Sequence, residues 1–396
     1  MIIAYNIILF FSILCLLHSY LIFPAVLKIL SANKKLPGRK KVEEKDLPHV
    51  CVLMAAYNEE KVISEKIKSV FQTSYPVEKL KLIIGSDGST DLTDTIIQSF
   101  ISREYPVIFK RFAGRNGKAY ILNELSEMAT GEILILTDAN IYFTEALVPV
   151  LVSHFTDESV GLVGANIINT GMRSDGISFQ EETYIQRENM IKYREGVLWG
   201  TMMGAFGACY AIRKSLFPPI PANFLMEDFY ITMHVLAQGK KAINELGAIA
   251  YEDVSNLIKE EFKRKTRISA GNYQNLGVYY RYLFLPFSKT GFSFISHKFL
   301  RWMGPFLIFL AYISSILLIH QNLFYLILFI LQTIGFLMPF IDTALKRMNI
   351  HIFAIRLVSY FYIMNAALFL GFIKYARGIR TSVWNPTIRN IETDNQ

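Results

Sequence analysis

The chain has 396 residues, of which 52% are hydrophobic and 19% charged, and its formal net charge is +8 at pH 7. Its length accommodates one large catalytic domain together with membrane-spanning helices, and its mean hydropathy of +0.30 is higher than expected for a soluble enzyme. The basic balance and the apolar ends favour an anionic membrane surface and an anionic substrate over nucleic acid, for which no binding signature is present. The 3 cysteines are too few and too far apart for a disulfide framework or a zinc site.

Residues 1–30 form an apolar segment long enough to cross a bilayer, and we expect an N-terminal transmembrane helix there. A cleaved signal peptide is the competing interpretation, but no basic region precedes the apolar run and no small-residue cleavage site follows it. The linker at 31–48 is basic and includes Lys34, Lys35 and Arg39. By the positive-inside rule, these residues place the following domain in the cytoplasm.

Residues 49–255 alternate short β-branched runs with segments whose apolar residues recur at helical spacing. Alternation of this kind predicts an α/β domain with a mostly parallel, Rossmann-like sheet. Ligands bind such a sheet in the loops that follow the carboxyl ends of its strands. The expected strands are 50–54, 80–84, 107–109, 132–136 and 160–164, and the expected helices are 59–71, about 90–100, 118–128 and 145–155.

Carboxylates follow these strands and apolar runs in order, at Asp87, at Asp138 and at the pair Glu227-Asp228. Asp138 and Asn140 supply two oxygen-bearing side chains at i and i+2, which suits Mg²⁺ or Mn²⁺ bridging a diphosphate. Glu227 beside Asp228 is the arrangement expected of a general base whose pKa is raised by a second acid. Each motif alone also fits a turn or a helix N-terminus with acids in its first turn. Together they favour a hard cation and a phosphorylated substrate.

Two further segments lie beside these acids in the sequence. Ala55–Glu60 closes the first strand and opens a helix, whose bare N–H groups bind an anion or a base edge; the alternative is an Asn58 helix cap. Lys118 stands at the expected start of a helix and is suited to neutralise phosphate. Its alternative interpretation is a solvated basic residue.

The last third of the chain is apolar again. The stretch Lys259–Arg267 is dense in charge and predicts an interfacial amphipathic segment over 256–298. Transmembrane helices are expected within 299–375, at about 302–319, 323–340 and 357–373, followed by a basic tail at 376–396. Four spans would place the C-terminus outside, whereas the basic tail favours the inside. One apolar segment in the interface, or a further span around 279–294, would reconcile the two.

In this order, the motifs resemble those of membrane-embedded family 2 glycosyltransferases with the GT-A fold, a group that includes poly-N-acetylglucosamine, hyaluronan and cellulose synthases. Glu227-Asp228 resembles the Thr-Glu-Asp base motif, and Met203–Arg213 resembles the glycine-rich acceptor loop. The resemblance extends from Val50 to about Arg267 in motifs and to Trp384 in architecture. It implies an α/β GT-A domain at 49–255 flanked by transmembrane helices.

The resemblance also implies a role for each residue that matches a motif. Asp228 is expected to be the catalytic base with Glu227 beside it, and Asp138 with Asn140 is expected to bind Mg²⁺ or Mn²⁺. Ala55, Tyr57 and Glu59 would line a uridine pocket, and Asp87 would hold the nucleoside. The remaining expected residues are Lys118, Asp138 and Arg267 at the donor, and Gly204, Ala205, Phe206 and Gly207 at the acceptor.

Three motifs depart from the family pattern, at four positions. Asn140 replaces the second acid of the metal motif, although an amide oxygen still ligates a metal, and Met226 replaces the threonine before Glu227-Asp228. Arg264 and Ile268 stand where the family has the Gln and Trp of Gln-x-x-Arg-Trp, and only Arg267 matches. Because that Gln and Trp accompany an acceptor sugar at a channel mouth, their loss favours transfer of one sugar over processive polymerisation.

The expected activity is that of a hexosyltransferase, which transfers a sugar with inversion from a UDP-sugar to a lipid-linked or polysaccharide acceptor in surface or exopolysaccharide biosynthesis. The expected location is a bacterial inner membrane with a cytoplasmic catalytic domain. Expected partners are membrane lipid and other polysaccharide-assembly proteins, and no nucleic acid. Two alternatives stay open: a polyprenyl-phosphate sugar transferase, and a non-catalytic scaffold of a polysaccharide export complex.

Overall fold

The computed structural model describes the chain except residues 38–42, 171–177, 254–256, 349, 351 and 385–396. The chain divides into two compact units. We call them the sheet unit and the helical unit. The sheet unit comprises Leu30–Arg173, Glu181–Asn256 and Ile379–Gln396, and the helical unit comprises Met1–Ile29, Ser174–Gln180 and Leu257–Gly378.

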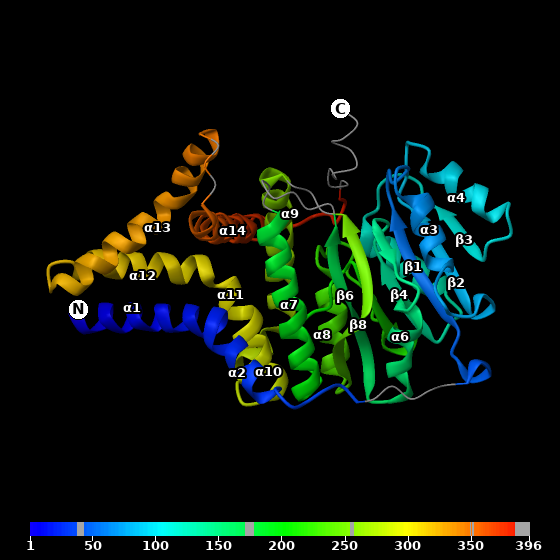
Figure 1. Ribbon diagram of the computed structural model, residues 1–396, viewed down its shortest axis with the longest axis horizontal. Helices are drawn as coiled ribbons and strands as arrows, with labels where there is room; N and C mark the ends of the chain where they lie inside the picture. Colours follow the sequence, from blue (N-terminus) through cyan, green and yellow to red (C-terminus); the bar gives the residue numbers. More distant parts are fainter. Residues whose placement is uncertain (38–42, 171–177, 254–256, 349, 351, 385–396) are drawn as a thin grey trace. The chain divides into compact units, whose positions relative to one another are not determined.

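The sheet unit is built on an 8-stranded sheet with the order β3-β2-β1-β4-β7-β6-β8-β5 (Figure 1). Strands β1 to β4 pair in parallel, β7 runs antiparallel to both β4 and β6, β6 pairs in parallel with β8, and the short β5 is antiparallel to β8. The α/β prediction is confirmed, with a parallel half that continues into a mixed half. The strands are β1 Val50–Ala56, β2 Leu80–Ser86, β3 Val107–Arg111, β4 Ile133–Thr137, β5 Ile141–Phe143, β6 Val160–Thr170, β7 Cys209–Arg213 and β8 Lys241–Asp253.

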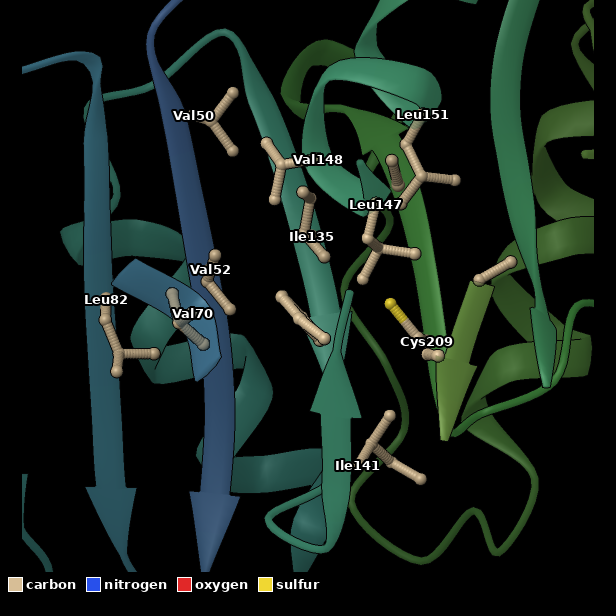
Figure 2. Close-up of a cluster of buried hydrophobic side chains, with 14 of the residues drawn as sticks. Val50, Val52, Val70, Leu82, Ile135, Ile141, Leu147, Val148, Leu151 and Cys209 are labelled. Atoms are coloured by element: carbon tan, nitrogen blue, oxygen red, sulfur yellow. The ribbon is translucent and has the colours of Figure 1, made fainter. Parts of the chain in front are cut away.

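Helices cover the sheet and bury its apolar side chains. Val52 of β1, Ile135 of β4 and Val70 of a helix share one core cluster, as Figure 2 shows. Because successive strand residues point to opposite faces, strands buried on both faces are apolar throughout, and every residue of β1 and β4 is buried. The helices of this unit are α3 Ile63–Phe71, α4 Thr93–Ile101, α5 Lys118–Met128, α6 Leu147–Ser153, α8 Glu227–Ala237, and α7 Ser178–Trp199 from Glu181 onward.

The register of the parallel strands brings the predicted motifs to one edge of the sheet. Ala56 at the end of β1 lies opposite Ser86 at the end of β2, and Leu53 of β1 lies opposite Leu136 of β4. The residues that follow these three strands are Tyr57, Asp87 and Asp138. They therefore leave the sheet at the same edge, where ligands bind in open α/β sheets.

The helical unit contains long apolar helices. Within the described residues, 3 helical segments are long and apolar enough to cross a membrane: Ile2–Leu30, Leu323–Arg347 and Phe353–Ala376. Helix α1 packs against α12, and α9 against α14. The elements are α1 Ile2–Leu17, a π-helical turn His18–Ile22, α2 Phe23–Leu30, α9 Ile258–Tyr279, a 3-10 turn Tyr280–Phe284, α10 Lys289–Ser293, a π-helical turn Phe294–Phe299, α11 Leu300–Trp302, α12 Gly304–Leu318, α13 Leu323–Arg347 and α14 Phe353–Ala376.

The apolar segment expected at 302–319 is joined to a preceding helix. Lys289–Trp302 and Gly304–Leu318 meet at a bend of 63°, which makes the pair a broken span or a re-entrant loop. Pro305 follows the bend, where proline suits the first turn of the new helix. Of the further apolar segment considered around 279–294, only residues 289–294 belong to this bent pair, and Tyr280–Phe284 form a 3-10 turn.

Candidate active site

Lys118 joins the predicted donor, metal and base motifs. It is the first residue of α5, and its Nζ lies 2.7 Å from Asp138 Oδ1 and 2.7 Å from Glu227 Oε1. Burial disfavours the ammonium charge, but the carboxylates of Asp138 and Glu227 outweigh burial and raise the pKa of Lys118. Three segments far apart in sequence, after β4, at the start of α5 and at the start of α8, thus share one cation.

Asp228 is the carboxylate of this cluster that is placed to act as a base. It is 6% exposed, and its Oδ1 accepts a 2.7 Å hydrogen bond from the N–H of Phe229. Its Oδ2 faces Gly207 of the predicted acceptor loop, where an added Cβ would lie 3.0 Å from that oxygen. One oxygen is therefore held by the backbone, and the other is directed at the loop.

The pKa of Asp228 is raised to about 6 by burial and by the neighbouring Glu227, against the opposing charge of Lys118. A base must be ionised, so we expect kcat to fall as the pH falls through about 6. Glu227→Gln removes one of the two causes and should move this acid limb to lower pH, whatever it does to the maximal rate. The measurement is kcat against pH for both proteins at saturating donor. An acid limb at the same pH in both proteins would contradict the assignment of Asp228.

The acceptor loop is anchored by buried polar groups of α7 and α8. The N–H of Met203 donates to Glu195 Oε2 at 3.0 Å, and the N–H of Ala205 donates to Thr232 Oγ1 at 3.0 Å. The hydroxyl of Thr232 donates in turn to the carbonyl oxygen of Asp228 at 2.7 Å, which ties the loop to the helix that carries the base.

Lys192 of α7 reaches the same loop, with its Nζ 3.2 Å from the ring centroid of Phe206. Lys192 and Glu195 are both buried, at 3% and 0% exposed. Neither residue was predicted from the sequence. Their spacing of three on a helix is the only sequence signal for them, and it is equally typical of an exposed ion pair.

We expect Gly207→Ala to lower kcat by about 10- to 100-fold, because the methyl group would press on Asp228 Oδ2 and misplace the base. Stability should change little, since the contact involves a side chain. Gly277→Ala is the control for a general glycine effect, because an added Cβ at this position of α9 meets only the Tyr375 hydroxyl, at 3.3 Å. Steady-state kinetics and thermal unfolding of both variants test this, and an unchanged kcat in Gly207→Ala would refute it.

Asp87 is fully buried at the end of β2 and organises the loop before α5. Its Oδ1 accepts from the N–H of Asn116 at 2.6 Å, and its Oδ2 accepts from the N–H of Gly117 at 3.1 Å and from Arg115 Nε at 3.3 Å. Gly117 has φ +92°, a conformation that L side chains rarely adopt. Asp87 therefore fixes the point at which α5 begins, and with it the position of Lys118.

Arg115 lies between two aromatic rings at the predicted donor pocket. Its guanidinium carbon is 3.2 Å from the ring centroid of Tyr57 and 5.5 Å from that of Trp384, and it donates to the carbonyl oxygen of Trp384. Ser382 donates to the carbonyl oxygen of Ala222 at 2.7 Å.

The segment 379–384, expected only as part of a basic tail, thus packs in the sheet unit against Arg115 and Gly117. A Cβ on Gly117 would collide with Ser382. A tryptophan and a serine in an otherwise basic stretch were the available signal for this packing.

The other predicted residues lie as follows. Ala55 is buried in β1, and Glu59 is 7% exposed, with its N–H donating to Thr93 Oγ1 at 2.8 Å. Asn140 is half-buried in the turn between β4 and β5. Arg267 lies on α9 in the helical unit, so its contribution to this site stays a prediction.

The residues after β4 fit a divalent cation that is completed by substrate. Asp138 is 39% exposed in its side chain, Asn140 is half-buried, and the intervening Ala139 is buried in the core. The described part of the chain contains no group of ≥ 3 His, Cys, Asp or Glu residues arranged to hold a metal. Mg²⁺ commonly takes one or two protein ligands and obtains the others from substrate phosphates and water. Asp138 and the Asn140 amide oxygen match that donor set.

Residues 51–219 match the family model described as "Glycosyl transferase family 2". The chain is 26% identical over 330 residues to the probable glycosyltransferase YdaM of Bacillus subtilis, covering 79% of this chain and 75% of that protein. It is 26% identical over 246 residues to a beta-monoglucosyldiacylglycerol synthase of Synechocystis, covering 60% and 50%. It is 24% identical over 250 residues to the poly-beta-1,6-N-acetyl-D-glucosamine synthase of Staphylococcus aureus, covering 62% and 59%. The matched part of the chain thus spans between half and three-quarters of the length of each of these relatives.

A solved structure has the same fold over nearly the whole chain. The mannosyltransferase PcManGT of Pyrobaculum calidifontis, in complex with GDP-Man and Mn²⁺, aligns with a TM-score of 0.68 and 20% identity, covering 95% of this chain and 97% of that one. The predicted GT-A fold is confirmed. Residues 51–219 therefore form a glycosyltransferase family 2 domain within a GT-A sheet unit, and the chain also has apolar helices that are candidates to span a membrane.

Proposed function

We propose that the chain transfers a sugar, with inversion, from a nucleotide-sugar donor to a lipid or lipid-linked glycan at a membrane. The observation that carries this proposal is the ion-pair bridge from Lys118 to Asp138 and Glu227. Beside it lies Asp228, a carboxylate whose pKa is raised to about 6. A scaffold without catalytic activity would have no use for a partly buried cation shared by two carboxylates. The family supports the transferase over the scaffold alternative.

The chemistry assigned to the residues is a single displacement. Asp228 Oδ2 takes the proton of the acceptor hydroxyl, and the acceptor oxygen forms a bond to C1 of the sugar. The bond from C1 to the diphosphate oxygen breaks, and its electron pair leaves with the nucleoside diphosphate. Lys118 stabilises that developing negative charge. A Mg²⁺ or Mn²⁺ ion bound through Asp138 and Asn140 would neutralise the diphosphate further.

The donor is proposed to be a UDP-sugar, with Tyr57 and Asp87 at the nucleoside. Arg115 stacks on Tyr57 and pairs with Asp87, so a base bound at Tyr57 would compete with the Arg115 guanidinium for that ring. Among the similar proteins, the solved mannosyltransferase carries GDP-Man, so the nucleotide has to be measured directly.

The acceptor and the location are proposed from the apolar helices and the relatives. Three helices suited to span a bilayer support an integral membrane protein whose sheet unit faces the cytoplasm, as in a bacterial inner membrane. One similar protein is named as a glycolipid synthase and another as a polysaccharide synthase. A membrane lipid, a lipid-linked glycan and a polyprenyl phosphate are the acceptors to compare, and polysaccharide-assembly proteins are the proposed partners.

The test is release of nucleoside diphosphate by the full chain in nanodiscs with Mn²⁺ or Mg²⁺. UDP- and GDP-sugars are offered with diacylglycerol, polyprenyl phosphate or a glycan primer. Turnover with one donor and one acceptor, lost in Asp228→Asn, would support the proposal and identify both substrates. Sugar transfer to polyprenyl phosphate alone would favour the alternative transferase. No release with any pair by folded protein would refute the proposal for these substrate classes.

A further inference from the structure

A fully buried lysine contacts both ends of the turn Asp138–Asn140, which carries the predicted metal ligands. Lys66 of α3 is 0% exposed. Its Nζ donates to Thr137 Oγ1 at 3.0 Å and to the carbonyl oxygen of Ile141 at 2.6 Å, and it lies 3.6 Å from the ring centroid of Phe143. None of these partners is a carboxylate. Within the described residues, Lys66 is thus a buried cation held by neutral groups only.

Such a residue costs folding free energy. Burial lowers the pKa of Lys66 to about 7, against the favourable charge of Asp138, because the interior disfavours the charged form. An apolar side chain of similar volume would avoid this cost. The stability of the core alone therefore does not account for a lysine at this position.

The two hydrogen bonds of Lys66 brace both ends of one turn. Thr137 is the last residue of β4 and Ile141 is the first residue of β5, so the bonded atoms flank Asp138-Ala139-Asn140. The N–H of Ile141 donates to the carbonyl oxygen of Asp138 at 3.4 Å across the turn. A single ammonium group thus fixes the spacing of the segment that carries the predicted metal ligands.

The bracing continues to the base through Thr137. While accepting from Lys66, the Thr137 hydroxyl donates to the carbonyl oxygen of Ala208 at 2.9 Å, and the N–H of Asp138 donates to the same oxygen at 3.2 Å. Ala208 follows Gly207, which faces Asp228. The chain of contacts from Lys66 therefore connects the turn that bears Asp138 to the loop in front of the base.

We propose that Lys66 is a positioning residue of the transfer reaction, which holds the Asp138–Asn140 turn in register with the loop that faces Asp228. It touches neither substrate nor metal and acts through Thr137 and Ile141. Its catalytic consequence rests on the proposed function, whereas the bracing itself does not. Loss of the brace should loosen the turn and the loop together and weaken both metal activation and turnover.

The test compares Lys66→Met, which keeps the chain length and removes the charge, with Val70→Ala one turn along α3. Val70 is buried in the same core without a polar link to the turn, so it controls for general loosening. Amide hydrogen exchange, without metal or donor, is followed in peptides covering 133–143 and 203–210. We expect exchange to accelerate about tenfold or more in both peptides of Lys66→Met and to stay near wild type in Val70→Ala.

The kinetic arm measures kcat and the Mn²⁺ concentration for half-maximal activation. Lys66→Met should lower kcat by about 10- to 100-fold and raise the Mn²⁺ requirement. Thr137→Val removes the hydroxyl at nearly constant volume and should show the same two effects. Lys66→Met and Thr137→Val break the same linkage. The double variant should therefore have a kcat no lower, and a Mn²⁺ requirement no higher, than Lys66→Met alone.

Wild-type exchange in the two peptides of both Lys66→Met and Thr137→Val would overturn the proposal, and so would equal acceleration in Val70→Ala. If Lys66→Met does not fold, the exchange of Thr137→Val decides. A wild-type protein that turns over no nucleotide sugar would refute the proposed function, while the exchange comparison would still decide whether Lys66 braces the turn.

Discussion

Asp228→Asn is expected to lower kcat by about 10²- to 10⁴-fold while leaving donor affinity nearly unchanged. An amide of the same shape cannot accept the acceptor proton, but its oxygen can still accept the hydrogen bond from the N–H of Phe229. The geometry of α8 should therefore survive. The measurement is single-turnover transfer together with donor binding by calorimetry.

Asp157→Asn is the matched control for Asp228→Asn. Asp157 lies in the same unit with a 43% exposed side chain and pairs with Lys241. It should keep the wild-type rate, because it has no contact with the acid cluster. If Asp228→Asn retained near-normal turnover, another group would have to be the base, and the orientation of Asp228 Oδ2 toward Gly207 would have no catalytic meaning.

Lys118→Met should lower kcat by about 10²- to 10³-fold, because the leaving diphosphate loses a positioned cation. The substitution also leaves Asp138 and Glu227 without their shared counter-charge. The pKa of Asp228 should rise further, since the positive charge of Lys118 normally opposes that rise. The acid limb of the rate profile should therefore move to higher pH as the maximal rate falls.

The control for Lys118→Met is Lys110→Met. Lys110 pairs with Glu124 of α5 at 2.8 Å, with side chains 38% and 31% exposed, so it reports the loss of a surface ion pair near the same helix. Its kinetics should match wild type, because exposed pairs contribute little. The measurements are kcat, donor KM and the pH profile. A Lys118→Met protein with wild-type values of all three would refute the role of the bridge.

The kind of fold and the order of the motifs follow from the sequence alone. Short β-branched runs alternating with helical periodicity can be buried only as an α/β sheet covered by helices. The ends of parallel strands share one edge, so Asp87 and Asp138 could be placed at a common site before any contact was known. The candidate membrane-spanning segments at both ends of the chain could also be predicted from the sequence, because the thickness of a bilayer sets the length of an apolar span.

Which side chains meet depends on how the chain packs. A lysine at a helix start, such as Lys118, has the same local pattern whether it is solvated or bridges two carboxylates. The role of Lys66 is even harder to predict from the sequence. Its neighbours along α3 indicate an ordinary amphipathic helix, and its hydrogen-bond partners are more than 70 residues away in the sequence.

The antiparallel β7, the short β5 and the packing of Ser382 and Trp384 beside Gly117 likewise depend on contacts between distant segments. The periodicity of a segment indicates which of its side chains are buried. It does not indicate which distant segment they contact, because that depends on how the whole chain packs. The motifs could therefore be found from the sequence, whereas the bridge, the brace and the packed C-terminal segment required the fold.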